Sequence, residues 1–425
     1  MTQKISPDTP TMIDLFAGCG GLSLGMETAG FTPLFVNELN SDAIETYLQN
    51  RDREHPHLRA KYQSRDIKQT VSNETFFDDL FDGLKRDFGR DFRKDSVDLL
   101  TGGPPCQGFS GIGIRRSYSV EKVQLPSNHL FQDMAFFVHK IRPKIFMFEN
   151  VEGLFRSRWT NEGSKGEIFA DVLGTFAAIP GYVVRHRLVY GKDYGVPQNR
   201  PRILILGMRE DIIDWDTSDQ DAIASGFLPT PIGMYPHIED LFSDIVDKKY
   251  TGGGSTSVYP RDPTNHWQEQ LRFDPVSGGI YPKGAALTEH DYSKHAPHVV
   301  EKFTYMIANN GRIPDHLQTK KFAQRVLPTR WGNQGPNITA CSLPDDFVHF
   351  SQPRSLTVRE WARLQTFPDW YQFAGKRTTG GIRRAGNPRE SIFEREVPKY
   401  TQIGNAVAVA MATEIGRHFR KKLKI

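Results

Sequence analysis

Residues 11–30 read TMIDLFAGCGGLSLGMETAG, and the fold class can be inferred from their pattern. A mostly apolar run leads into a glycine-rich turn. The segment after the turn places Leu22, Met26 and Ala29 on one helical face and closes at Gly30. A strand, a glycine turn and a helix in this order begin a doubly wound fold, in which ligands gather at the carboxyl ends of the strands.

Further strands are expected up to residue 209, because short apolar runs alternate with amphipathic segments. This alternation predicts an α/β fold with a doubly wound, mostly parallel sheet. The predicted strands are Thr11–Ala17, Thr32–Glu38, Ser96–Thr101, Lys144–Val151, Tyr182–Tyr190 and Arg202–Met208.

The character of the sequence changes after residue 210. Nine acidic groups occur in residues 211–247, and the following stretch to residue 340 is rich in proline, glycine, asparagine and histidine. Helical periodicity returns over Ala406–Lys424. The expected organisation is a catalytic domain (1–210), a smaller irregular domain (211–399) and a C-terminal helix (400–425) that returns to the catalytic domain.

The composition excludes several classes of protein. With 425 residues, 38% of them hydrophobic and 24% charged, the chain is neither a disordered tail nor a fibre nor a coiled-coil rod. It has no apolar run of about 18 residues and no apolar signal segment at its start, so we expect a cytoplasmic protein that does not contact a membrane. Its three cysteines form no Cys-x-x-Cys pair, and we therefore expect neither a disulfide framework nor a metal site.

Positive charge gathers near the end of the chain. The net charge is +4, but residues 354–425 hold 15 Lys or Arg against 6 Asp or Glu. This excess predicts phosphate contacts, and the basic stretch Lys376–Arg389, which has no acidic residue, is the best candidate for a loop along a nucleic acid. A solvated surface loop is the alternative.

The glycine turn and Glu38 together indicate an adenosine-bearing ligand. Ser23 stands where dinucleotide-binding folds have their third glycine, which disfavours a nicotinamide or flavin site. Glu38 ends the second predicted strand, where a carboxylate can accept hydrogen bonds from ribose hydroxyls. A tight structural turn and an ordinary surface carboxylate are the alternatives.

Three further features suggest catalysis. Cys106 follows two prolines on a glycine-rich loop, which is a poor place for core packing and a good one for a nucleophile. Glu149 ends an apolar strand, where burial raises the pKa of a carboxyl enough for it to donate to a ring nitrogen. Arg200 and Arg202, two residues apart, can bind a carbonyl or a phosphate. A buried cysteine, a strand-end carboxylate and a plain salt bridge are the respective alternatives.

In combination these features resemble the DNA cytosine-5 methyltransferases, over roughly residues 11–209 and 354–417. The family blocks present, in family order, are Asp-Leu-Phe-Ala-Gly-x-Gly-Gly, Gly-Gly-Pro-Pro-Cys-Gln-Gly-Phe-Ser, Phe-Glu-Asn-Val, Gln-Asn-Arg-Pro-Arg, Leu-Thr-x-Arg-Glu-x-Ala-Arg-Leu-Gln-x-Phe-Pro-Asp and Gln-Ile-Gly-Asn-Ala-Val. The resemblance implies the Rossmann-like methyltransferase fold, with residues 211–399 as a target-recognition domain.

The resemblance also implies roles for individual residues. Cys106 is then the nucleophile, Glu149 the acid that engages the cytosine ring, and Arg202, with Arg200 beside it, the contact to the base carbonyl. The positions that correspond to S-adenosylmethionine contacts are Asp14, Phe16, Ala17, Gly18, Gly20, Gly21, Glu38, Leu39, Asp66, Ile67, Pro104, Leu130, Asn405 and Val407. Leu39 departs from the family, which often has a tryptophan there. The expected DNA contacts are Gln107, Ser110, Arg115, Arg116, Lys376, Arg377, Arg383 and Arg384.

The implied chemistry explains these residue types. C5 of cytosine is too electron-poor to accept a methyl group until a thiolate adds to C6 and an acid engages N3. Because C6 is inaccessible in a duplex, the base has to be flipped out of the stack. The expected partners are therefore double-stranded DNA and S-adenosylmethionine, without a metal.

Competing functions leave different signatures. A cytidine deaminase needs His-x-Glu followed by Pro-Cys-x-x-Cys, and this order is absent. The tRNA-methylating branch of the family carries Cys-Phe-Thr, which is also absent, and a non-catalytic DNA-binding relative is expected to have lost the cysteine or the glutamate. RNA methylation and non-catalytic binding remain the alternatives. The compact length resembles restriction–modification enzymes, so a companion endonuclease that shares the site without a stable complex is expected, with a solitary enzyme as the alternative. A monomer is expected because each flipped base needs only one pocket.

Overall fold

The computed structural model describes residues 5–105, 126–318, 324–330, 338, 346–378 and 396–425. Within them, no helix is long and apolar enough to cross a membrane.

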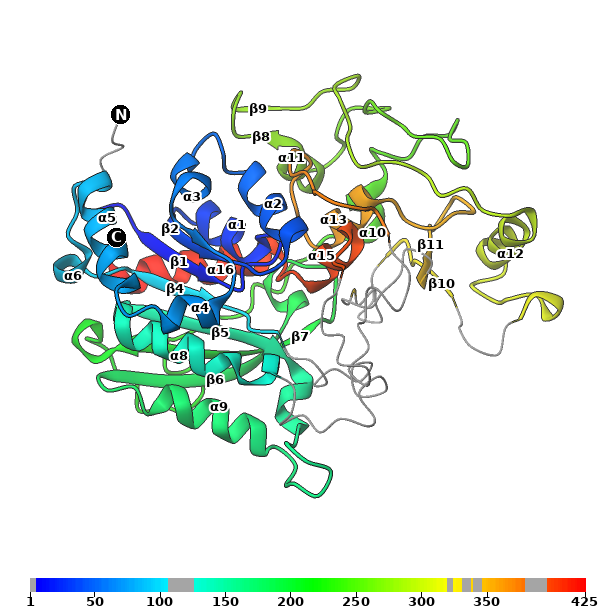
Figure 1. Ribbon diagram of the computed structural model, residues 1–425. Coiled ribbons are helices and arrows are strands. Elements are labelled where there is room, and N and C mark those ends of the chain that lie inside the picture. The colour runs from blue at the N-terminus through cyan, green and yellow to red at the C-terminus, as the bar shows by residue number, and fades with distance from the viewer. Residues whose placement is uncertain (1–4, 106–125, 319–323, 331–337, 339–345, 379–395) are drawn as a thin grey trace.

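A seven-stranded sheet forms the centre of the molecule, in the order β3-β2-β1-β4-β5-β7-β6 (Figure 1). β7 runs antiparallel to β5 and β6, and the other pairs are parallel. This confirms the predicted α/β fold with a mostly parallel sheet. The two-residue strand β3 was not predicted, because so short a run has no periodicity. The strands are β1 (Thr11–Leu15), β2 (Thr32–Asn37), β3 (Gln63–Ser64), β4 (Leu99–Gly102), β5 (Ile145–Val151), β6 (Tyr182–Tyr190) and β7 (Pro201–Arg209).

Helices cover both faces of the sheet because successive side chains of its central strands point to opposite sides. In β1, Met12 belongs to the core on one face and Ile13 to the core on the other. One face is covered by α1 (Gly21–Thr28) and α16 (Val409–Leu423), the other mainly by α5, α8 and α9. The helices on that second face and its edge are α2 (Ser41–Gln49), α3 (Pro56–Ala60), α4 (Ile67–Ser72), α5 (Phe76–Phe88), α6 (Phe92–Asp95), α8 (Leu130–Ile141) and α9 (Glu167–Ala177).

The C-terminal helix α16 lies directly against α1. A Cβ placed on Gly25 would overlap the Cβ of Ala412, and one on Gly416 would lie 2.8 Å from the Cβ of Ala29. Glycine at these positions therefore permits the close approach. The predicted start of this helix at Ala406 is wrong: Ala406 and Ala408 have extended backbone, and the helix begins at Val409.

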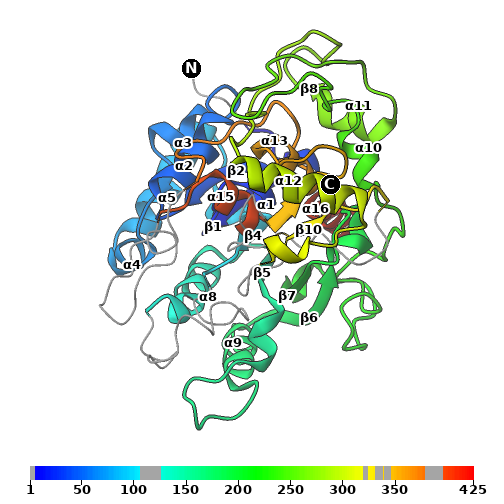
Figure 2. The ribbon, with the colours of Figure 1, turned by 90° about the vertical axis from the view of Figure 1, so that its right-hand side faces the viewer.

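The described residues between 238 and 405 form the irregular part at the carboxyl ends of the strands (Figure 2). It holds two short strand pairs and several helices. These elements are α10 (Ile238–Phe242), α11 (His266–Arg272), β8 (Phe273–Asp274), β9 (Gly279–Ile280), α12 (Pro297–Ala308), β10 (Arg325–Val326), β11 (Phe347–Val348), α13 (Val358–Leu364) and α15 (Lys399–Asn405). Residues 222–228 pack instead with α16 in the core of the sheet. The domain boundaries at 210 and 399 stay predictions.

Buried ion pairs connect α13 to its neighbours. Arg363 pairs with Asp244 and Asp369, each at 2.5 Å, and Arg354 pairs with Glu360 at 2.6 Å. Arg359 is also fully buried. The prediction that the whole basic stretch of residues 354–425 contacts phosphates is therefore wrong for these three arginines, whose guanidinium groups are enclosed in the protein.

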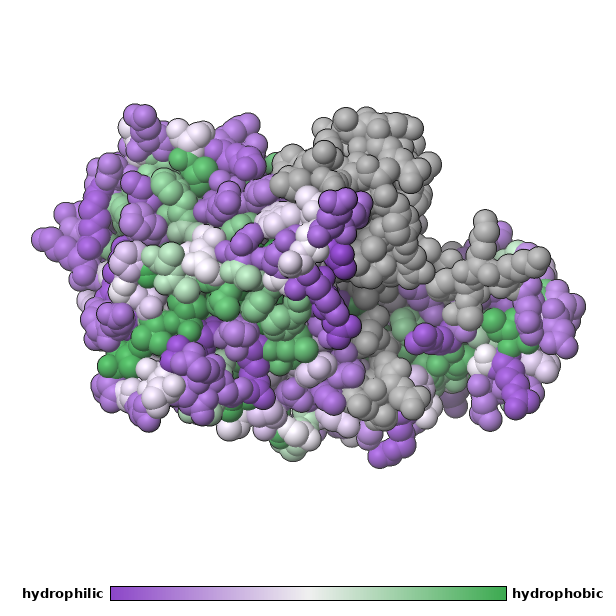
Figure 3. All heavy atoms as spheres, turned by 90° about the horizontal axis from the view of Figure 1, so that it is seen from below, coloured by the Kyte–Doolittle hydropathy of each residue, from purple (hydrophilic) through white to green (hydrophobic). Residues whose placement is uncertain are grey.

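The outer surface of the catalytic part is mixed in polarity. Seen from below, hydrophobic residues gather over α9 and the edge strand β6 (Figure 3), where the half-buried side chains include Phe169, Leu173 and Val184. These residues pack inward against the sheet core, so they complete the core from its outer side.

Candidate active site

The carboxyl ends of β1, β2, β4 and β5 bring three of the predicted blocks to one edge of the sheet. The glycine turn follows β1, Glu38 follows β2, and Pro104 follows β4. Glu149 lies two residues before the end of β5, and Arg202 on the neighbouring strand β7 pairs in register with Val151, the last residue of β5. The site residues thus come from the ends of separate strands and from the loops that follow those strands, as is usual for a doubly wound sheet.

The turn after β1 is held open by its backbone. Gly18 and Gly20 have φ values of 56° and 84°, and Phe16 also has a positive φ of 55°. The Glu38 carboxylate accepts hydrogen bonds from the backbone N–H of Gly18 at 2.9 Å and of Asn40 at 2.7 Å. Among the described residues, no atom outside Gly18 and its two chain neighbours lies within 4 Å of a Cβ built on Gly18. The turn therefore offers open space in which a ligand can approach the backbone.

Two residues that the sequence did not single out support this turn from behind. Tyr371 donates its hydroxyl hydrogen to the carbonyl of Cys19 at 2.5 Å. Arg51 donates to the carbonyl of Gly20 at 3.3 Å and is paired with Glu27 at 2.7 Å. The sequence alone gives little reason to select Tyr371 or Arg51, because neither belongs to a glycine-rich or catalytic motif.

Other predicted cofactor residues surround the same edge. The backbone carbonyl of Val407 lies 2.5 Å from a Cβ built on Gly21, so the last family block touches the first. Asp66 caps α4 by accepting from the N–H of Lys68, and the next residue, Ile67, is buried. Leu39 is 67% exposed, and Asn405 is exposed at the end of α15. Leu130 is half-buried at the start of α8 and packs against the sheet core.

Asp14 is a buried carboxyl directly behind the turn. One oxygen accepts a hydrogen bond from Thr101 at 2.8 Å, and the other has no hydrogen-bond partner among the described residues. Burial raises the pKa of Asp14 to about 7, although hydrogen bonds and Arg51 oppose this shift. Burial therefore favours the neutral carboxylic acid over the carboxylate at pH values below about 7.

The free energy of unfolding of the Asp14→Asn variant is therefore expected to depend less on pH than that of the wild-type protein. The pKa of Asp14 rises on folding from 3.8 to about 7, so the folded state holds more protons between these values. The free energy of unfolding consequently falls as pH rises through this window, by at most about 1.4 kcal/mol per pH unit. Thermal unfolding at pH 5, 6, 7 and 8 measures this slope. Equal slopes for the two proteins would show that Asp14 does not titrate in this range.

Glu149 and Arg202 form the charged centre of the site. Glu149 Oε1 lies 2.5 Å from Arg202 Nε, and both side chains are about nine-tenths buried. Burial raises the pKa of Glu149, while the two nearby arginines oppose this. A Cβ on Gly103 would lie 3.0 Å from Glu149 Oε2, so the glycine lets the loop after β4 pass close to the carboxyl. Asn150 holds that loop by donating to the carbonyl of Pro104 at 3.1 Å.

Arg200 is placed differently from Arg202. Its Nη2 donates to the carbonyl of Gly404 at 2.5 Å, whereas Nε and Nη1 are buried and have no hydrogen-bond partner within the described ranges. Burial lowers the pKa of Arg200, and Arg202 adds to this effect. The two arginines thus do not act as one pair: Arg202 meets the acid, and Arg200 connects this block to residues 404–406.

Several predicted site residues lie outside the described residues. They are Cys106, Gln107, Ser110, Arg115, Arg116, Arg383 and Arg384. Of the predicted basic loop, Lys376 is described and pairs with Glu396 at 3.2 Å, while Arg377 donates to Ser293 at 3.0 Å. Within the described ranges, no three His, Cys, Asp or Glu side chains cluster as metal ligands.

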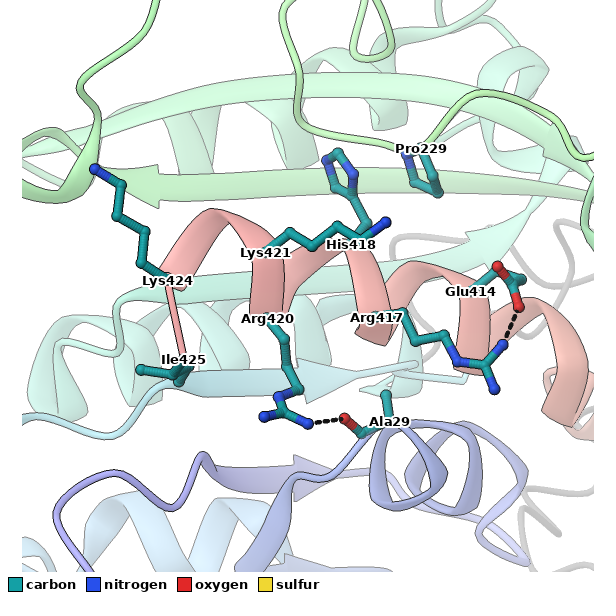
Figure 4. A pocket seen from close by; sticks show the side chains of 9 residues that line it. All are labelled: Ala29, Pro229, Glu414, Arg417, His418, Arg420, Lys421, Lys424 and Ile425. Carbon is teal, nitrogen blue, oxygen red and sulfur yellow. Dashed lines mark hydrogen bonds and ion pairs between the residues drawn. The ribbon is translucent and has the colours of Figure 1, made fainter.

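A separate hollow of about 530 Å³ lies at the C-terminal end of α16 (Figure 4). Its Arg420 donates to the carbonyl of Ala29 at 3.2 Å and so satisfies the end of α1, and Arg417 pairs with Glu414. Ala29 precedes β2, so this hollow lies at the amino ends of the strands. It is at the opposite end of the sheet from Glu149 and is not part of the site.

Comparison with known proteins identifies similar chains. The chain is 29% identical to the type II methyltransferase M.DdeI of Desulfomicrobium norvegicum, over 96% of this chain and 89% of that one. It is also 29% identical to M.XorII of Xanthomonas oryzae pv. oryzae, over 98% and 85%. Among solved structures, a prophage-encoded DNA modification methyltransferase (E. coli) aligns with a TM-score of 0.64 at 22% identity, covering 98% of this chain and all of that one. This last match supports the fold.

The family model for C-5 cytosine-specific DNA methylases matches residues 10–421, which include every block described above. S-adenosylmethionine is the methyl donor that this family implies, and DNA is the substrate. The chain therefore belongs to the C-5 cytosine-specific DNA methylases and is a DNA cytosine-5 methyltransferase.

Proposed function

We propose that this protein is the modification enzyme of a type II restriction–modification system, methylating a flipped cytosine within one short duplex sequence through a covalent cysteine–C6 intermediate. The observation that carries the chemistry is the buried Glu149–Arg202 pair beside the proline loop. The assignment to a restriction–modification system is supported by the relatives, which are named type II methyltransferases and match over most of their length.

In the proposed reaction, the thiolate of Cys106 supplies the electron pair for a new S–C6 bond. The Glu149 carboxyl, whose pKa is raised by burial, gives its proton to N3 from its protonated form, so the electrons displaced from the C5–C6 double bond make C5 nucleophilic. Arg202 holds the Glu149 carboxyl and offers N–H groups to the base carbonyl. After methyl transfer, solvent takes the C5 proton, the C5–H electrons re-form the C5–C6 double bond, and the thiolate leaves with the electrons of the S–C6 bond. N3 then returns its proton to the Glu149 carboxylate.

The cofactor would lie on the glycine turn. S-adenosylmethionine, when bound, supplies an electrophilic methyl group. The open space above Gly18 fits a ligand held by backbone contacts, and the Glu38 carboxylate is positioned beside that turn. Asp66, Pro104, Asn405 and Val407 border the same edge and would complete the pocket. No metal takes part in the proposed mechanism.

The remaining predicted partners complete the proposal. Gln107, Ser110, Arg115 and Arg116 would contact the DNA strand around the flipped base, and residues 211–399 would read the sequence in the groove. The enzyme would act as a cytoplasmic monomer, since each flipped base needs one pocket. A companion endonuclease would share the recognition sequence without a stable complex.

Base-resolution bisulfite sequencing tests this function directly. DNA from a methylation-free bacterial host that expresses the protein is expected to contain protected cytosines in one short sequence only. Protected cytosines in many unrelated sequences would contradict the restriction–modification role. No protection in DNA, with methylated cytosine in RNA from the same cells, would instead favour an RNA substrate.

Neutralising the predicted basic loop is expected to weaken DNA binding at every sequence. In the triple variant with Lys376, Arg383 and Arg384 changed to Gln, each lost phosphate contact lowers the slope of log K against log salt by about 0.9. Arg377 is kept, because its guanidinium bonds Ser293. Fluorescence anisotropy at several salt concentrations measures the slope.

The matched control removes three cations at the other end of the sheet. Arg417, Lys421 and Lys424 border the hollow at the end of α16, and changing them to Gln removes the same formal charge. Only a small change in slope is expected for this variant. Equal effects of the two triple variants would show that net charge, and not the loop, governs binding.

A further inference from the structure

Two buried glutamines connect three parts of the chain that are far apart in sequence. Gln198 and Gln365 are both completely buried. The Nε2 of Gln198 donates to the side-chain oxygen of Gln365 at 3.1 Å and to the carbonyl of Leu364 at 2.5 Å. The two side chains thus join the arginine block before β7 to the end of α13.

The hydrogen bonds continue from both ends of this pair. The side-chain oxygen of Gln198 accepts from the backbone N–H of Ile338 at 3.0 Å. The Nε2 of Gln365 donates to the carbonyls of Ile403 at 3.0 Å and Ala406 at 3.1 Å. Arg200 donates to that same Ala406 carbonyl at 3.5 Å, and to Gly404 at 2.5 Å. An unbroken series of hydrogen bonds therefore runs from Ile338 to Arg200.

The two ends of this series have different proposed roles. Ile338 belongs to the region proposed to read the DNA sequence, whereas Arg200 stands two residues before Arg202, which holds the Glu149 carboxyl. Residues 403–406 lie next to the glycine turn through Val407. Buried amide networks of this kind permit few alternative arrangements, because a displaced amide leaves a donor or acceptor unsatisfied.

We infer that Gln198 and Gln365 are positioning residues, forming an amide relay that fixes the recognition region relative to the catalytic arginines. The roles assigned to the two ends of this relay rest on the proposed function. Both side chains are completely buried and bond to protein groups, so we assign neither of them a contact to the base or the cofactor. They keep Arg200 and Arg202 in position when the recognition region binds DNA.

The test uses Gln198→Met, Gln365→Met and the double variant, because methionine has a similar length and volume but cannot continue the relay. Each single change is expected to lower kcat roughly 10- to 100-fold, as small misplacements of catalytic groups do. The Kd for cognate DNA should stay within about threefold of wild type, because no DNA contact is removed. The double variant should be no slower than the slower single variant by more than about twofold, because either change already breaks the relay.

Gln268→Met is the matched control for loss of a buried amide. Gln268 is also completely buried, and its Nε2 donates to Asp240 and Ser243 within its own neighbourhood. A comparable fall in Tm with nearly unchanged kcat is expected for this variant. If a methionine variant folds poorly, Gln198→Asn serves instead, since it keeps an amide but is one methylene too short to reach Gln365.

The outcomes separate this inference from the proposed function. Inactive wild-type protein on DNA would contradict the function itself. The relay would be overturned if the wild-type protein is active and the relay variants, like Gln268→Met, show a lower Tm but an unchanged kcat. Losses that multiply in the double variant would also overturn it, because they would mean that the two amides act independently.

Discussion

Replacing Cys106 with alanine is expected to abolish methyl transfer, with a loss of at least about four orders of magnitude in kcat, because the proposed covalent route has no other nucleophile. DNA binding should remain within about threefold of wild type, since the contacts to phosphates and bases are kept. Transfer of a tritiated methyl group from S-adenosylmethionine to cognate DNA measures the rate, and anisotropy measures binding.

The cysteine controls make this prediction specific. Cys341→Ala removes a thiol with no assigned role and should leave the rate nearly unchanged. On DNA in which the target cytosine carries fluorine at C5, the wild-type enzyme should form a complex that resists denaturation, because the C5 proton needed for release is missing. Cys106→Ala should form none. Substantial methyl transfer by Cys106→Ala would show that another group attacks C6.

Changing Glu149 to glutamine is expected to lower kcat by roughly 10² to 10⁴, the usual contribution of a general acid. Glutamine keeps the shape of the side chain but cannot transfer a proton to N3, and it removes the charge that pairs with Arg202. The effect should appear in kcat more than in DNA affinity. Rapid-quench measurement of a single turnover separates the chemical step from product release.

The pH profile provides an independent test of the same role. Burial raises the pKa of Glu149, so its protonated, active form persists to higher pH than for an exposed glutamate. The wild-type rate should therefore fall as pH rises through this pKa, and the residual rate of Glu149→Gln should lack that fall. Glu45→Gln, which removes an exposed carboxylate paired with Arg59, should keep the wild-type profile. A wild-type profile retained by Glu149→Gln would assign the proton to another group.

Local sequence patterns predicted most of the sheet and the positions of the site blocks. The apolar runs gave the six longer strands to within about three residues at their ends, because buried strands alternate their side chains between two cores. The antiparallel direction of β7 and the short strand β3 did not follow from those runs, since strand direction depends on connections and pairing. The start of α16 was placed three residues early, because apolar spacing continues through the extended residues 406–408.

Short contiguous blocks of the sequence are enough to identify the proposed chemical groups and their order: Cys106, Glu149, Arg200, Arg202 and the glycine turn. How these groups are partnered follows from the fold and not from the blocks. It separated Arg202, which meets Glu149, from Arg200, which reaches Gly404, and it enclosed Arg354, Arg359 and Arg363. Burial and hydrogen bonding between groups such as Arg200 and Gly404, which are 204 positions apart, depend on how the layers pack, and no local pattern of residues encodes that packing.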